Sequence, residues 1–179
     1  MLKFCFFLFA TMIFIGCETV PPLEFTPRDI EVSKTNVNAG IRRISVSIAS
    51  ESERVGRTDV GFGGNIYEIS FKDTLEDALD EALIRSTIFN DSSSRTLLLA
   101  VKVLQFETPP AGITFDTNAT IRYDFISTQT GETIFSKTIK SFGNVSPEYA
   151  FLGATRYTEA RNIAIRNNIS KLLQSIEPF

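Results

Sequence analysis

The feature that most constrains this chain is an apolar segment at its amino terminus. Lys3 precedes an uncharged stretch, residues 4–16, which ends in a small residue just before Cys17. A helix that spans a bilayer needs about 20 apolar residues, so this stretch is too short for a permanent membrane span and has the form of a cleavable signal peptide. We therefore predict that residues 1–16 direct export and are removed.

The residues around the predicted cleavage site indicate a lipid anchor. The quartet Phe14, Ile15, Gly16 and Cys17 resembles the lipobox of bacterial lipoproteins, although this family most often has Leu and then a small residue in the first two places. The resemblance implies cleavage after Gly16 and attachment of a diacylglycerol (S-linked) and an N-acyl chain, typically palmitate, to Cys17. An ordinary secretory signal with a chance cysteine is the alternative. Lipoproteins with Asp after the cysteine tend to stay in the inner membrane, so Glu18 implies the outer membrane, facing the periplasm.

The residues after Cys17 have the composition of a tether. Pro21, Pro22 and Pro27 favour an extended, rather stiff chain, and no periodic pattern appears before Ile41. Two or three acyl chains on one cysteine would hold the protein persistently on a membrane. We therefore predict a signal peptide at 1–16, a lipidated extended tether at 17–40 and a single domain at 41–179.

The composition restricts how this domain folds and what it binds. Both cysteines lie in the first seventeen residues, so the exported domain folds without a disulfide. With 43% hydrophobic residues and 16 Phe, it can build a hydrophobic core. The net charge is −3 and no basic run exceeds the pair Arg42 and Arg43, which we expect to be solvated, so nucleic acid is not an expected partner.

Hydrophobic spacing divides the first half of the domain into a strand and a helix. Ile44, Val46 and Ile48 alternate with small or polar residues, which predicts a strand ending near Ser50. The glycine-rich segment 60–70 predicts a loop and a short strand. From Phe71 the spacing becomes helical, and the apolar stripe of this predicted helix passes through Leu75, Leu79 and Leu83.

The second half predicts an antiparallel meander followed by a helix. Strands are expected at 96–107, at 113–127 and at 133–142, separated by turns, and the apolar run of the first predicts that it is central in the sheet. A helix is expected over 146–176, with a bend near Gly153 and an end marked by Pro178. The element order predicts an α+β fold, a mostly antiparallel sheet of about four to five strands with two helices on one face.

The sequence predicts no catalytic or metal-binding residues. Histidine is absent, which removes the commonest general base and zinc ligand. The densest acidic group, Glu76, Asp77, Asp80 and Glu81, falls mostly on the solvent side of the predicted helix. The glycines at 61, 63 and 64 lack the residues of a phosphate-binding loop and predict a turn.

The aromatic residues of the predicted meander allow two interpretations. Phe115, Tyr123, Phe125 and Phe135 belong to a core in the first and line a lipid-binding groove in the second. Paired strands more often bury such side chains, so we favour the core.

The anchor at Cys17 and the order of elements over 41–176 together resemble small envelope lipoproteins of the YajG type. They are also similar to accessory lipoproteins of lipopolysaccharide assembly and of lipid-transport ABC systems. These resemblances imply a non-enzymatic, membrane-anchored module that binds or scaffolds an envelope protein partner and needs no cofactor. A periplasmic lipid or glycolipid carrier is the alternative, and an envelope enzyme is a third, less favoured interpretation.

Overall fold

The computed structural model describes residues 19–60 and 65–179 of the chain. Its elements are β1 (Gly40–Ile48), α2 (Asn65–Ser86), β2 (Thr96–Glu107), β3 (Phe115–Ser127), β4 (Thr133–Val145) and α3 (Gly153–Ser175). Within these residues the strands form a four-stranded sheet in the order β1-β2-β3-β4. The predicted α+β class and the central place of β2 are confirmed.

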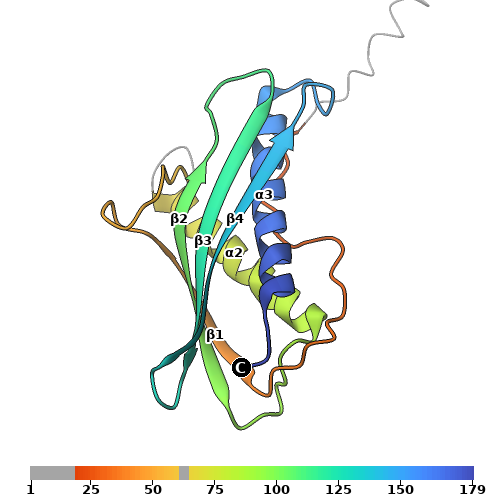
Figure 1. Ribbon diagram of the computed structural model, residues 1–179. Coiled ribbons are helices and arrows are strands. Elements are labelled where there is room, and N and C mark those ends of the chain that lie inside the picture. The colour runs from red at the N-terminus through yellow and green to blue at the C-terminus, as the bar shows by residue number, and fades with distance from the viewer. Residues whose placement is uncertain (1–18, 61–64) are drawn as a thin grey trace, which may run out of the picture.

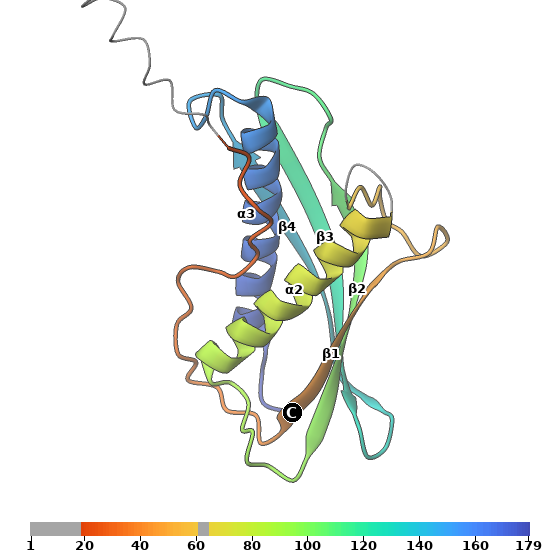
Figure 2. The same cartoon turned by 180° about the vertical axis from the view of Figure 1, so that it is seen from behind.

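The sheet is mostly antiparallel, with a parallel pair at the β1 edge. β1 runs parallel to β2, with Gly40 opposite Thr96 and Ile48 opposite Val103, so the chain has to cross over between them and α2 lies in that crossover. β2, β3 and β4 form the predicted antiparallel meander. Both helices cover the same face of the sheet, α2 next to β1 and α3 along β3 and β4 (Figure 1, Figure 2).

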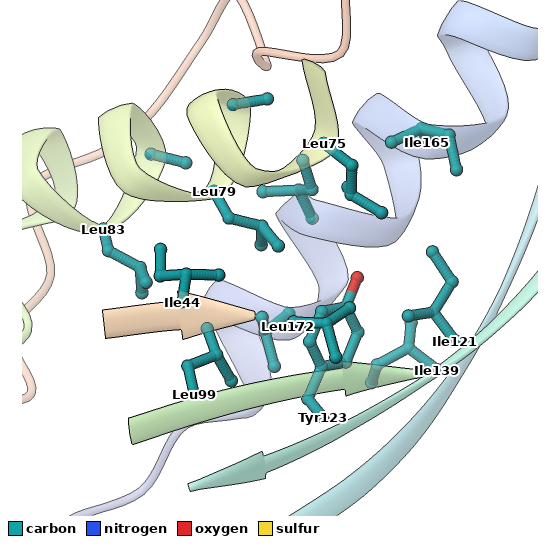
Figure 3. Packing of buried hydrophobic residues seen from close by; sticks show 14 of the residues in the cluster. Ile44, Leu75, Leu79, Leu83, Leu99, Ile121, Tyr123, Ile139, Ile165 and Leu172 are labelled. Carbon is teal, nitrogen blue, oxygen red and sulfur yellow. The ribbon is translucent and has the colours of Figure 1, made fainter. Parts of the chain in front are cut away.

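The hydrophobic core fills the layer between the helices and the sheet. Leu75, Leu79 and Leu83 form the predicted apolar stripe of α2, and none is more than 5% exposed. α3 adds Ile165 and Leu172, which are fully buried. Figure 3 shows these side chains pointing toward the strand residues Ile44, Leu99, Ile121, Tyr123 and Ile139. The apolar area buried in this layer is the main stabilising contribution to the fold.

The first turns of α2 contradict the sequence prediction. A loop and a short strand are predicted over 60–70, whereas α2 already begins at Asn65. Ile69, whose β-propensity favours a strand, is 56% exposed on the outside of the helix. An ion pair of 2.6 Å between Lys72 and Glu68, four residues apart, stabilises the helical conformation here. The predicted strand is wrong because β-propensity depends on a sheet neighbour, and this segment has none.

The start of α3 also differs from the prediction. A helix is predicted over 146–176 with a bend near Gly153, whereas residues 146–152 form a loop and α3 begins at Gly153. Leu152 has an extended backbone, with φ −72° and ψ 125°. The guanidinium of Arg156 hydrogen-bonds two carbonyl groups of the loop, which therefore need no helical N–H partners. Gly153 marks the start of the helix and not a bend.

Part of the segment assigned to the tether packs on the domain. Phe25 is 1% exposed, and the centroid of its ring lies 5.3 Å from that of Phe71. Val37 and Ala39 are also buried. These apolar residues are isolated positions in an irregular segment, so they produce no periodicity that a sequence pattern could reveal. The packed part of the chain therefore includes residues before Ile41.

Candidate functional site

The residues predicted for lipid attachment lie outside the described part of the chain. These are Gly16 for cleavage, Cys17 for lipidation and Glu18 for sorting. The glycine-rich turn at 61–64 lies outside it as well. Over residues 19–60 and 65–179, no helix has both the length and the hydropathy needed to cross a membrane. Lipidation at Cys17 stays a prediction from the sequence.

The acidic residues of α2 do not form a site. Asp77, Asp80 and Glu81 are exposed, as predicted, and Glu76 is half-buried. Glu81 pairs with Arg85 at 3.1 Å, an ordinary contact between successive helical turns. The described residues contain no group of three or more His, Cys, Asp or Glu that could hold a metal ion.

The segment that leads toward Cys17 is held against α3 by a buried amide. The backbone N–H of Glu24 donates to Oδ1 of Asn162 at 3.0 Å, and Nδ2 of Asn162 donates to the carbonyl oxygen of Pro22 at 3.1 Å. Asn162 is 1% exposed, so both hydrogen bonds are partly shielded from water. Together with the buried ring of Phe25, they fix the place where the chain leaves the domain, at the amino-terminal end of α3 (Figure 2).

An open apolar pocket lies beside this exit. Its volume is about 640 Å³, which is within the range of small-molecule sites. Among the described residues, five parts of the chain form its wall: residues 20–24, which we call the exit segment, the region around the start of α2, the loop between β2 and β3, the start of β3 and the first turns of α3. The lining residues are Pro21, Leu23, Val60, Tyr67, Pro110, Ala111, Gly112, Phe115, Gly153, Ala154, Tyr157, Thr158 and Arg161.

Arg161 places a buried positive charge at this pocket. It is 3% exposed, and its Nη1 donates to the carbonyl oxygen of Asp59 at 2.8 Å and to the hydroxyl of Tyr157 at 2.9 Å. Its Cζ lies 4.4 Å from the centroid of the Phe106 ring, a cation–π distance. Burial lowers the pKa of Arg161 because the charged form loses hydration. Among the described residues, no carboxylate lies within ion-pair distance of it.

The groups in the pocket are suited to binding. Its polar side chains are the hydroxyls of Tyr67, Tyr157 and Thr158 and the guanidinium of Arg161. Among the described residues, the lining holds no carboxylate, thiol, amine or imidazole, the usual side chains of general acid–base catalysis near neutral pH. A group with an apolar body and one hydrogen-bond acceptor or negative charge would match this lining.

The aromatic residues of the meander divide between core and pocket. Tyr123 and Phe125 are fully buried in the main core, and Phe135 packs against it, which confirms the core interpretation for these three. Phe115 belongs to a second, smaller cluster with Tyr157, whose ring lies edge-on at 5.7 Å, and it lines the pocket. The sequence shows nothing that singles out Phe115, since it shares the strand pattern of the others.

The comparisons with known proteins identify the fold. No family model matches the sequence, and no curated protein matches it. A Xanthomonas campestris protein of the DUF330 family has 16% identity and a TM-score of 0.54, over 87% of this chain and 91% of that chain. PelC of Paraburkholderia phytofirmans has 10% identity and a TM-score of 0.45, over 80% and 90%. A minor lipoprotein of Acinetobacter baumannii has 13% identity and a TM-score of 0.42, over 75% and 90%. The first likeness shows a shared fold and nothing more.

Proposed function

We propose that this chain is a lipid-anchored, non-enzymatic protein of the bacterial envelope that works by binding another envelope component. The lipobox-like residues ending in Cys17 supply the anchor, and Glu18 favours the outer membrane and a periplasmic orientation, as in lipoproteins of the YajG type. The observation that carries the proposal is the position of the apolar pocket, which lies where the chain leaves the domain toward Cys17.

The anchor is tested by Cys17→Ser. The native chain is expected in the membrane fraction with an intact mass raised by the acyl groups. The variant should lose this added mass and shift to the soluble periplasmic fraction, because no lipid holds it in the bilayer. An unchanged mass and an unchanged distribution between fractions would contradict lipidation at Cys17.

A protein partner is the occupant of the pocket that we favour. A carrier of the kind considered from the sequence needs an apolar cavity between sheet and helices, and that layer is filled with buried side chains. The pocket instead opens at the end of the domain. A partner's side chain that has an apolar body and a hydrogen-bond acceptor could enter it and accept a hydrogen bond from Arg161.

Site-specific photocrosslinking in the native envelope tests this partner. A photoreactive residue at Thr158, in the pocket wall, should give a discrete protein adduct. As a matched control, the photoreactive amino acid is placed at the exposed Lys171 of α3, where it should give no such adduct. Filling the pocket with Ala154→Trp should remove the adduct without lowering the melting temperature, because Ala154 is exposed. Equal adducts from both positions, or none from Thr158, would contradict partner binding at the pocket.

A lipid or glycolipid carrier is the second candidate, and Arg161 is the observation that favours it. Arg161 is a buried guanidinium that Asp59 attracts only from beyond ion-pair distance. Next to apolar walls, it matches an amphiphile with an anionic head group. Native mass spectrometry should then find a lipid bound to the purified chain, retained in Arg161→Lys and lost in Arg161→Gln. If the native chain carries no ligand, the carrier hypothesis is contradicted and the hypothesis of a protein partner remains.

A further inference from the structure

Large apolar side chains gather at the end of the domain from which the chain leaves toward Cys17. We call Val20, Ile113, Tyr149 and Phe151 the apolar tip. Their exposed fractions are 50%, 75%, 55% and 92%. Two loops carry three of them, the β2–β3 loop and the β4–α3 loop, and both loops lie at the same end of the molecule as the exit segment in both views (Figure 1, Figure 2). Water is an unfavourable environment for such a cluster.

The loop that carries Phe151 is held by the domain. Nη1 of Arg156 donates to the carbonyl oxygen of Ala150 and, at 3.0 Å, to that of Phe151 itself. The same guanidinium lies over the ring of Phe115, 5.9 Å from its centroid. Phe151 is therefore presented to solvent by an ordered loop, and its exposure does not require a loop that has come away from the domain.

The covalent chain brings the predicted anchor to this tip. The hydrogen bonds of Asn162 fix the exit segment at Pro22 and Glu24, two and four residues beyond Val20. Cys17 is three residues before Val20 in the sequence, and even an extended chain advances at most about 3.6 Å per residue. A bilayer that holds acyl chains on Cys17 therefore lies next to the apolar tip.

We propose that the apolar tip inserts into the boundary between head groups and acyl chains of the leaflet that holds the Cys17 lipid. The inference rests on the proposed lipidation and adds a second attachment, which fixes the orientation of the domain so that the pocket lies close to the membrane surface. Glu148, exposed and three residues before Phe151, has to keep its carboxylate hydrated. The insertion is therefore shallow, as for other interfacial proteins.

The absence of tryptophan from the chain allows a direct test. The lipidated F151W variant is reconstituted in phosphatidylcholine vesicles whose acyl chains carry bromine, a quencher of indole fluorescence. Its emission should shift to the blue and be quenched at least twofold relative to vesicles without bromine. I84W is the matched control, because Ile84 is 61% exposed near the carboxy-terminal end of α2, which lies away from the apolar tip. The indole introduced there should remain unquenched. Equal behaviour of the two variants would overturn the proposal.

A second measurement separates the tip from the anchor. Unlipidated C17S chain is mixed with phosphatidylcholine vesicles, and its partition coefficient is compared with that of C17S/I113S/F151S. Loss of two apolar side chains that the membrane would bury should weaken partitioning at least tenfold. The melting temperature should stay unchanged because both positions are exposed in the folded chain. Equal partitioning would overturn the tip proposal even if Cys17 is lipidated. Conversely, the native chain could show no added lipid mass while partitioning of the C17S chain still depends on Ile113 and Phe151. That result would overturn lipidation at Cys17 but not the binding of the tip to membranes.

Discussion

The two faces of the sheet place different demands on the sequence. The face under α2 and α3 buries Leu99, Ile121 and Tyr123 completely. The helix-free face carries Lys102 and Arg122, which reach solvent. On the covered face the shape of each residue has to fit a neighbouring helix, whereas on the helix-free face charges pair in water. Substitutions of similar size should therefore have very different effects on the two faces.

A network of hydrogen bonds around Asn168 is buried on the covered face. Asn168 is not exposed, and its Oδ1 accepts from the Tyr123 hydroxyl at 2.8 Å. Its Nδ2 donates to the carbonyl oxygen of Ile139 at 3.1 Å and to the hydroxyl of Ser141 at 2.8 Å. Burial raises the pKa of Tyr123, so its hydroxyl stays protonated and remains a donor. This network fixes α3 on β3 and β4.

Polar groups on the helix-free face are paired at the surface. Lys102 meets Glu53 at 2.5 Å, and Arg122 meets Asp124 at 2.9 Å. Both side chains of the first pair and the arginine of the second are more than a third exposed. Water screens exposed pairs of this kind, so this face contributes little to stability through its charges.

Gly143→Ala is expected to have the largest effect. Gly143 lies on β4 under α3, and a Cβ atom there would stand 2.1 Å from the carbonyl oxygen of Ala160 and 2.6 Å from the backbone nitrogen of Ala164. Both neighbours are backbone atoms, so α3 would have to move away from the sheet. We expect a loss of about 3 kcal/mol in the free energy of unfolding, measured by urea titration.

The matched control for this prediction is Gly153→Ala, at the start of the same helix. A Cβ atom there would meet only the Arg156 and Phe115 side chains, at 3.8 Å or more. The free energy of unfolding should change by less than about 1 kcal/mol. Similar losses in the two variants would mean that close packing of α3 on β4 does not determine the loss of stability in Gly143→Ala.

Asn168→Ala should have the next largest effect. The substitution leaves the buried Tyr123 hydroxyl without its acceptor and Ser141 without its donor, and buried unpaired groups are costly. We expect a loss of about 2–3 kcal/mol in the free energy of unfolding. The adjacent Asn167 is exposed and donates to the carbonyl oxygen of Phe142 at 2.9 Å, so Asn167→Ala should lose less than about 1 kcal/mol. Equal losses would contradict the role given to the buried network.

The covered face is also the part of the fold that the sequence predicts best. Alternation along β2 and β3 and the helical spacing of Leu75, Leu79 and Leu83 directly record which side of each element meets the core. The parallel pairing of β1 with β2 could not be predicted, because alternation tells which face of a strand is buried but not which strand lies beside it. The exposed pair Arg42 and Arg43 follows from a β-bulge, which alternation also does not reveal.

The pocket could not be predicted for a different reason. Its wall comes from five separate parts of the chain, and each part contributes residues that are ordinary in their own element. An arginine in a helix is usually expected at the surface. Arg161 is buried because it packs on the Phe106 ring and donates to the carbonyl oxygen of Asp59, and both residues are far away in sequence. The Asn162 contacts with Pro22 and Glu24 are equally non-local. Lipidation at Cys17 could be proposed from the sequence alone because the predicted signal is contained in adjacent residues.

Glu53→Gln should give the smallest effect, and its pH dependence tests whether charge acts on the helix-free face. Hydrogen bonds from Lys102 and Ser50 lower the pKa of Glu53 from 4.5 to about 2. A carboxyl group whose pKa is lower in the folded chain stabilises the fold above its unfolded pKa, and this contribution is lost as the pH falls from about 4.5 toward 2. The melting temperatures of the native chain and the variant should differ slightly and constantly from pH 7 to 5. They should converge as the pH falls further and also in 0.5 M salt, because the group is exposed.

Glu51→Gln, an exposed neighbour with no hydrogen bond to Lys102, is the control. A difference that persists at pH 2 would mean that Glu53 acts through its shape, as residues on the covered face do, and not through its charge.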